Sequence, residues 1–111
     1  MLKRVLPALL IAALSMTTAA THVWAKPATC YTDDEGRYPC DFEQFGGDGS
    51  FTISARGVPH YTISIEGRGV ASGFADYGNG RNVPLPGPFY RSRQDRACWV
   101  SDATGFRICA Y

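Results

Sequence analysis

The chain has 111 residues and a formal net charge of +1, and 19% of its residues are charged. A chain of this length forms one domain with a limited core. Its balanced charge excludes proteins that bind polyanions through a general basic excess, so we predict no nucleic-acid partner.

The first 25 residues have the layout of a secretory signal peptide. Two basic residues near the start precede an apolar run from Val5 to Leu14, and a region of small residues ends at Ala25. The apolar run is too short to cross a bilayer core of about 30 Å, which needs about 20 residues. We therefore predict cleavage after Ala25, or alternatively after Ala20. Residues 26–111 would then be exported as one domain, periplasmic or secreted, without a transmembrane segment.

Four cysteines lie in the predicted mature chain, at Cys30, Cys40, Cys98 and Cys109. An even number of cysteines in a short exported chain predicts disulfide bonds, each of which stabilises the fold by about 2–3 kcal/mol. A zinc site would need closer C-x-x-C pairs than the wide spacings found here. Of the possible pairings we favour Cys30–Cys40 with Cys98–Cys109, because each of these pairs brackets a turn.

Short alternating segments predict β-strands, whereas helical periodicity is nearly absent. The predicted strands are Ser50–Ala55, His60–Glu66, Val70–Asp76, Asn82–Leu85 and, briefly, Phe89–Arg91. Gly- and Pro-rich turns separate them. This spacing predicts an all-β fold, a small antiparallel sandwich or barrel of about 6–8 short strands, stapled by disulfide bonds.

The C-terminal segment from Ala97 to Tyr111 predicts a β-hairpin. Asp102 and Gly105 suit the first and last positions of its turn. If these two residues pair, Cys98 lies directly opposite Cys109, at a separation that a disulfide bond can span. A bulge at Gly105 would change this register.

The predicted core follows the apolar face of the strands and of the hairpin. It consists of Phe42, Phe51, Ile53, Tyr61, Ile63, Ile65, Val70, Phe74, either Trp99 or Val100, Phe106 and Ile108. A core of this size leaves a thin stability margin, so we expect the fold to depend on its disulfide bonds.

No group of residues predicts catalysis or metal binding. His60, the only histidine after the leader, has no Ser or Cys nucleophile near it in the sequence. The acidic run Asp33–Glu35 lacks the alternating spacing of a calcium loop and is better explained as a solvated turn. The glycine-rich stretches fit neither a calcium-binding repeat nor a dinucleotide-binding motif. We therefore expect no enzyme activity, no metal and no cofactor.

Two surface features are candidates for partner binding. Tyr77 lies in a Gly-rich turn, and Arg91, Arg93 and Arg96 follow one another closely in a polar segment. Tyr and Arg are common anchors of protein interfaces, although a packed Tyr77 and a solvated arginine loop explain the pattern equally well. Connections alternate between the two ends of an antiparallel barrel, and only the short Asn82–Leu85 strand separates the Tyr77 turn from the arginine segment. We therefore predict that the two lie close together and, if the domain binds a protein, act as one surface.

Three short motifs recur in a known family: Tyr38-Pro39-Cys40, Ala75-Asp76-Tyr77-Gly78-Asn79-Gly80 and the final Cys109. They resemble the Tyr-x-Cys, the Ala-x-Tyr-x-x-Gly and the C-terminal Cys of the small periplasmic inhibitors of C-type lysozyme. Members of that family are signal-bearing, disulfide-closed antiparallel barrels. The resemblance therefore implies that fold, a lysozyme partner and a Cys40–Cys109 bridge.

The resemblance also assigns roles to single residues. Family members insert a loop serine into the lysozyme active site, and Ser72 is its match, one residue farther from Tyr77 than in the family. Arg93 stands where the family has a lysine. The resemblance and the surface features together make Ser72, Tyr77, Arg91 and Arg93 the predicted partner-binding residues.

The sequence thus predicts an exported, non-enzymatic β-domain that binds a protein or a cell-envelope polymer. One alternative is a lysozyme-inhibitor-like protein. Another is a carbohydrate- or peptidoglycan-binding module that uses an exposed Trp or Tyr as a stacking face. A third is a purely structural envelope protein.

Overall fold

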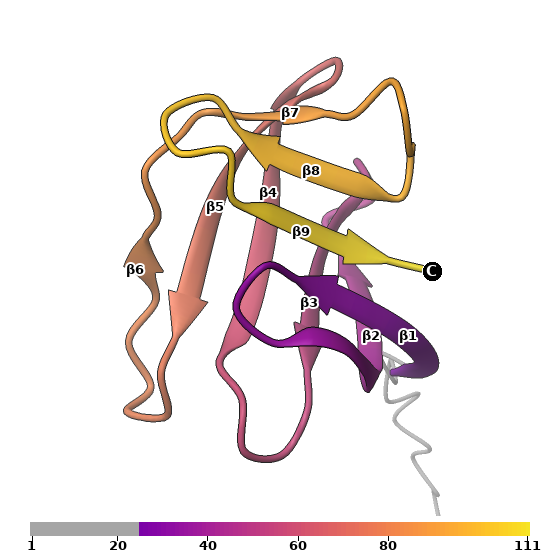
Figure 1. Ribbon diagram of the computed structural model, residues 1–111, viewed down its shortest axis with the longest axis vertical. Coiled ribbons are helices and arrows are strands. Elements are labelled where there is room, and N and C mark those ends of the chain that lie inside the picture. Colours follow the sequence, from indigo (N-terminus) through magenta and orange to yellow (C-terminus); the bar gives the residue numbers. More distant parts are fainter. Residues whose placement is uncertain (1–24) are drawn as a thin grey trace, which may run out of the picture.

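The computed structural model describes residues 25–111, so the predicted signal peptide, Ala25 excepted, lies outside the described residues. Residues 25–111 form nine β-strands and no helix (Figure 1). The strands are β1 Lys26–Thr32, β2 Gly36–Phe45, β3 Ser50–Ser54, β4 His60–Gly67, β5 Val70–Asp76, β6 Val83–Pro84, β7 Phe89–Arg91, β8 Cys98–Ser101 and β9 Arg107–Ala110. The predicted all-β class is confirmed.

Eight of the strands close into an antiparallel barrel, and the ninth, β6, is an additional strand on β5. Around the ring the order is β4-β3-β2-β1-β9-β8-β7-β5, and pairing between β4 and β5 closes it. The sequence predicted either a sandwich or a barrel, and the structure is a barrel.

Strands β6 and β7 share one edge of β5. β6 pairs with the second half of β5 and β7 pairs with the first half. Between them, Leu85 N donates to Gly73 O over 2.8 Å, so the two short strands together follow β5 along its length. A strand of this length spans roughly 20 Å. The β5–β6 turn and the β7–β8 loop therefore lie at opposite ends of the barrel.

The turns fall into two groups, one at each end of the barrel. We call the end with the β1–β2, β3–β4, β5–β6 and β8–β9 turns the mouth. The other end, with the β2–β3 and β4–β5 turns and the β7–β8 loop, is the arginine end. This alternation arises because short turns reverse the chain between antiparallel neighbours.

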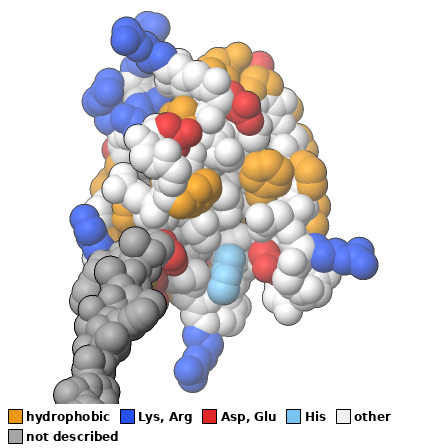
Figure 2. All heavy atoms as spheres, turned by 180° about the vertical axis from the view of Figure 1, so that it is seen from behind, with side chains coloured by type: hydrophobic (Ala, Val, Ile, Leu, Met, Phe, Trp, Pro, Cys, Tyr) orange, Lys and Arg blue, Asp and Glu red, His pale blue; other side chains and the backbone are white. Residues whose placement is uncertain are grey.

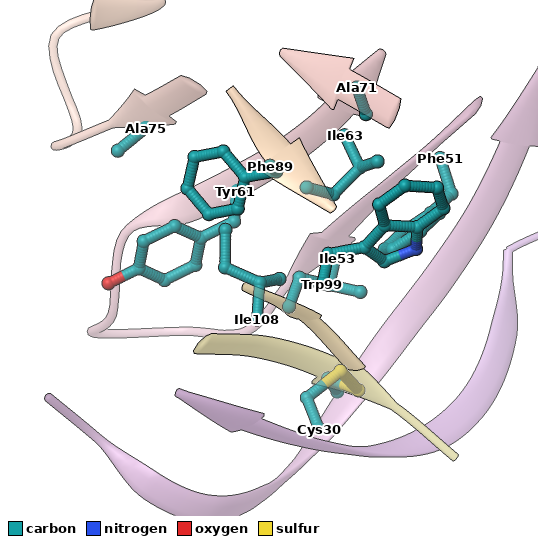
Figure 3. Packing of buried hydrophobic residues seen from close by; sticks show 11 residues of the cluster. Cys30, Phe51, Ile53, Tyr61, Ile63, Ala71, Ala75, Phe89, Trp99 and Ile108 are labelled. Carbon is teal, nitrogen blue, oxygen red and sulfur yellow. A yellow bond between two sulfur atoms is a disulfide. The ribbon is translucent and has the colours of Figure 1, made fainter. Parts of the chain in front are cut away.

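Side chains from all round the ring fill the barrel (Figure 3). The buried hydrophobic residues are Cys30, Cys40, Phe51, Ile53, Tyr61, Ile63, Ala71, Ala75, Phe89, Cys98, Trp99, Ile108 and Cys109. Trp99 is 2% exposed and takes the core position for which Val100 was the alternative. Three further predicted core residues, Phe42, Ile65 and Phe106, are half-buried and pack against this cluster.

The face of strand β5 that points into the barrel is the opposite of the one that the sequence predicted. Its buried residues are Ala71, Gly73 and Ala75. The predicted core residues Val70 and Phe74 therefore lie on the outer face, half-exposed. The cause is Phe89, which is fully buried, because a Cβ at Gly73 would lie 2.5 Å from Phe89 Cε1. Small residues on β5 make room for this ring.

Both predicted disulfide bonds are present. The Cα atoms are 5.8 Å apart in Cys30–Cys40 and 4.0 Å apart in Cys98–Cys109. In the C-terminal hairpin Cys98 lies opposite Cys109 without a register shift, as the turn predicts. Cys40 is bonded to Cys30, so the Cys40–Cys109 bridge that the family resemblance implies is not formed.

Candidate functional site

Four arginines surround a groove at the arginine end of the barrel. They are Arg68 in the β4–β5 turn, Arg91 in β7, and Arg93 and Arg96 in the β7–β8 loop. The groove has a volume of about 410 Å³, and Asp48 is the one acidic residue among the described residues that line it. In Figure 2, Lys and Arg side chains gather at the upper left, over this end of the molecule.

The closure of the barrel fixes the position of Arg91. Its backbone N–H donates to Gly69 O over 3.0 Å, which ties the end of β7 to the β4–β5 turn and brings Arg68 to the same groove. The Arg91 guanidinium lies above the Trp99 ring, with Cζ 4.9 Å from the ring centroid. Because Trp99 belongs to the core, Arg91 covers this end of the core and is held there by a cation–π interaction.

Hydrogen bonds within the β7–β8 loop fix its conformation. The Ser92 hydroxyl oxygen accepts the backbone N–H groups of Gln94 and Asp95, each over 3.1 Å. The Asp95 carboxylate accepts a further backbone N–H of the loop over 3.0 Å. Arg93 and Arg96 therefore project from a fixed turn, so less conformational entropy is lost when they bind a partner.

Two carboxylates at this end of the barrel, Asp95 of the β7–β8 loop and Asp48 of the groove lining, already accept hydrogen bonds. The Tyr111 hydroxyl donates to Asp95 over 2.5 Å, and this bond lowers the pKa of Asp95 below its usual value. The backbone N–H of Ser50 donates to Asp48 over 2.9 Å, and hydrogen bonds from Ser50 lower the pKa of Asp48. Within residues 25–111, none of the four groove arginines forms a salt bridge. No carboxylate of the described residues therefore occupies their N–H groups, although the face of the Arg91 guanidinium is already in contact with Trp99.

This arrangement suits a carboxylate-bearing ligand. A guanidinium group is planar and donates two parallel N–H bonds to one carboxylate, which gives both affinity and orientation. Tyr90, which precedes Arg91 on β7, is 47% exposed but lies on the outer face of the barrel, outside the residues that line the groove. The groove therefore matches an acidic surface of a ligand.

The other two predicted partner-binding residues lie outside this groove. Tyr77 is 62% exposed in the β5–β6 turn at the mouth. Ser72 lies within β5, not in a loop, and its hydroxyl donates to Glu66 over 2.8 Å. The structure thus brings Arg91 and Arg93 together but separates them from Tyr77 by the length of β5. The prediction of one joint surface is wrong.

Sequence reasoning missed Arg68 and Asp48 as members of the groove. The sequence identifies Gly67-Arg68-Gly69 only as a turn after a strand. Topology supplies the missing information, because β5 pairs with β4 on one edge and with β7 on the other. The β4–β5 turn must then lie beside the end of β7.

The geometry defines the chain as a small, disulfide-bonded antiparallel barrel with an arginine groove at one end. No protein-family model, curated protein sequence or solved structure matches it significantly. Within residues 25–111 we find no helix long and apolar enough to cross a membrane. In the same residues, His, Cys, Asp and Glu side chains do not gather in groups of three or more that could hold a metal ion.

Proposed function

We propose that this chain is an exported, non-enzymatic protein that binds an acidic surface of a partner protein through the arginine groove. The observation that carries the proposal is the convergence of four arginines that have no salt bridge among the described residues. Like charges brought together repel one another. Carboxylates of a partner would remove that repulsion and accept charge-assisted hydrogen bonds.

The rest of the chain favours a protein over a nucleic acid or a sugar. Residues 26–111 hold nine Lys and Arg against ten Asp and Glu, so the basic groove is a local feature of a chain with balanced charge. A nucleic acid needs a longer basic track along its phosphates. A sugar would stack on an exposed Trp or Tyr, but Trp99 is covered by Arg91, and the exposed Tyr77 lies at the mouth, outside this groove.

Export is part of the same proposal. Two disulfide bonds are typical of proteins in an oxidising compartment. The pattern of residues 1–25 supports secretion through a cleaved signal peptide. The partner would then be a protein of the periplasm, the cell envelope or the medium.

C-type lysozyme is the most specific candidate partner. The sequence resemblance supports it, and this enzyme acts through a pair of carboxyl groups in its cleft, a chemistry that arginine side chains complement. Ser72, which bonds to Glu66 within β5, lacks the loop setting that the family's serine has. In this chain the arginine groove, and not a serine loop, would make the contact.

The test compares the wild-type protein with the double variant Arg93→Ala/Arg96→Ala and with Arg81→Ala. Inhibition of a C-type lysozyme and capture of acidic envelope proteins are measured for each. We expect the double variant to lose affinity at least about tenfold at unchanged melting temperature, because truncated interface anchors typically cost about 2 kcal/mol or more. Arg81, an exposed arginine between β5 and β6 at the mouth, is the matched control and should have no effect.

Each part of the proposal can be contradicted by a separate experimental result. If the wild-type protein leaves lysozyme activity unchanged, lysozyme is not the partner, and the acidic envelope proteins remain as candidates. If the double variant captures the same proteins as the wild type, the arginine groove is not the binding site. Added salt should weaken the contact, because charges at a surface are screened.

A further inference from the structure

A second concave site lies at the mouth, at the opposite end of the barrel from the arginine groove. The pocket has a volume of about 490 Å³, and its walls come from the β1–β2, β5–β6 and β8–β9 turns and from the segment between β6 and β7. Its apolar lining residues are Tyr61, Tyr77, Leu85, Pro86, Phe89 and Phe106. Apolar pockets of about 300–1,000 Å³, often at the mouths of barrels, are typical sites for small molecules.

Aromatic rings from different elements line this pocket. Tyr61 and Phe89 are buried members of the core, and Figure 3 shows the Tyr61 hydroxyl pointing away from the packed cluster. The Tyr61 and Phe106 ring centroids are 6.0 Å apart. Core packing fixes these rings, so the site is formed before any ligand arrives.

Hydrogen bonds fasten the β1–β2 turn across the barrel beside the pocket. The Tyr61 hydroxyl donates to Glu35 Oε1 over 2.8 Å, and the Thr32 hydroxyl donates to the same oxygen. Burial and the Glu35 carboxylate raise the pKa of Tyr61, so its hydroxyl stays protonated and continues to donate. These bonds hold Asp33 and Asp34 at the edge of the pocket.

The edge of the pocket is negatively charged. Asp33 and Asp34 line it, and no basic residue among residues 25–111 does so. Asp33 is paired, since Arg107 donates to it from Nη2 over 2.6 Å and from the backbone N over 2.8 Å. Asp34 is exposed and forms no salt bridge within the described part of the chain, so its charge is not neutralised there.

We propose that this pocket binds a small organic cation, an amine or quaternary ammonium compound with an apolar body. The aromatic faces attract a cation through their quadrupoles. Asp34 supplies the opposite charge, and the apolar lining buries the body of the ligand. The same charge disfavours anions. This ligand class therefore differs from the acidic partner of the arginine groove, and either site can fail its test without the other.

Benzyltrimethylammonium is a suitable probe, because it joins one aromatic ring to a permanent positive charge. Benzyl alcohol is the neutral comparison and phenylacetate the anionic one. We expect the cation, titrated into the oxidised protein, to shift the ring resonances of Tyr61 and Phe106 to saturation in NMR spectra. Benzyl alcohol should bind about three- to tenfold more weakly, and phenylacetate more weakly still.

Variants separate the contributions of charge and aromatic surface. Asp34→Asn removes the charge at nearly constant size, and Tyr77→Ala removes an exposed wall of the pocket. Each should weaken binding of the probe about three- to tenfold. Asp41→Asn changes an exposed carboxylate of β2 outside the pocket and should bind as the wild type does. Arg93→Ala/Arg96→Ala should also leave this binding unchanged.

Three results would overturn the proposal. One is the absence of saturable shifts with benzyltrimethylammonium. Another is equal affinity for benzyl alcohol, or equal weakening by Asp34→Asn and Asp41→Asn, because charge would then have no part in binding. The third is binding of phenylacetate as tight as that of the probe, because the pocket would then not select a cation.

Discussion

Gly73 shows at the scale of a single residue how closely the barrel is packed. A Cβ at this position would lie 2.5 Å from the nearest carbon of the Phe89 ring. Phe89 is fully buried, so its ring cannot move aside without disturbing the core. We therefore expect Gly73→Ala to lower the free energy of unfolding by about 1–3 kcal/mol, the usual cost of overpacking. Urea denaturation measures this loss.

Gly67→Ala is the matched control for this substitution. A Cβ at Gly67 would meet Val70 Cγ1 at 3.4 Å, which is an ordinary contact. Neither Gly67 nor Gly73 has a positive φ, so the backbone accepts alanine at both positions. An equal loss of stability in the two variants would show that the contact with Phe89 is not the cause.

Asp33 makes the stability of the fold depend on pH. Hydrogen bonds from Arg107 lower the pKa of Asp33 below 3.8, against the opposing effect of desolvation. A carboxyl group whose pKa is lower in the folded state stabilises the fold above its unfolded pKa and loses that contribution as the pH falls through the folded value. We therefore expect Asp33→Asn to lower the melting temperature at neutral pH. The difference from the wild type should shrink as the pH falls below 3.8.

Asp102→Asn provides the comparison, because Asp102 is an exposed aspartate of the β8–β9 turn without a salt bridge among the described residues. Its effect on the melting temperature should not follow the same pH profile. A difference between wild type and Asp33→Asn that stays constant from neutral pH to strongly acidic pH would contradict the assignment to Asp33.

At the scale of elements, each disulfide bond joins two neighbouring strands. Cys30–Cys40 links β1 to β2, and Cys98–Cys109 links β8 to β9. We expect Cys98→Ser/Cys109→Ser to lower the free energy of unfolding by about 2–3 kcal/mol, because the unfolded chain regains the entropy that the closed loop removed. Urea denaturation of the oxidised protein gives this difference. Peptide mass spectrometry without reduction should show these two links, and a Cys40–Cys109 link would contradict the structure.

Strands with clean alternation were predictable from the sequence. The expected bounds of β5 and β7 agree with the structure, and those of β3 and β4 differ by one residue at one end. The hairpin register was also predictable, because Asp102 and Gly105 define the turn and Cys98 then meets Cys109. These elements depend on local chemistry, which one stretch of sequence contains.

The bounds of β1 and β2 could not be predicted in this way, because proline interrupts the alternating pattern of both strands. Pro39 in β2 lacks the N–H that a ladder usually needs. The structure shows why it is tolerated: its partner Thr29 exchanges hydrogen bonds with Tyr111 on the other side of β1. The β2–β3 pairing begins only at Asp41, so Pro39 lies before the stretch that pairs with β3. Such tolerance depends on neighbours that are distant in sequence.

The inward face of β5 and the membership of the arginine groove depend on distant neighbours too. The alternation in β5 leaves two possible inward faces, and the larger side chains of Val70 and Phe74 indicated the wrong face. Only the pairing of β5 with β7 reveals that Phe89 occupies the space. Arg91 and Arg93 were found because they are adjacent in sequence, whereas Arg68 joins them only through the fold.

At the scale of the whole molecule, barrel closure separates two chemically different ends. The mouth carries a pocket with Asp33 and Asp34 on its edge, and the far end carries the arginine groove. A chain with almost no net charge is therefore electrically polar along the barrel. A protein partner at one end would leave the pocket at the other end open to a small ligand.

The short strand β6 has a further consequence. A closed barrel lacks the open sheet edges on which extended chains add. Among the described residues, the strand at the edge of the sheet is β6, which is two residues long. Prolines at positions 84, 86 and 88 occupy this edge and the segment after it, and none has an N–H that could bond to a strand of another molecule. The barrel therefore offers almost no template for fibril growth or edge-to-edge aggregation, a hazard that unprotected β-sheets carry.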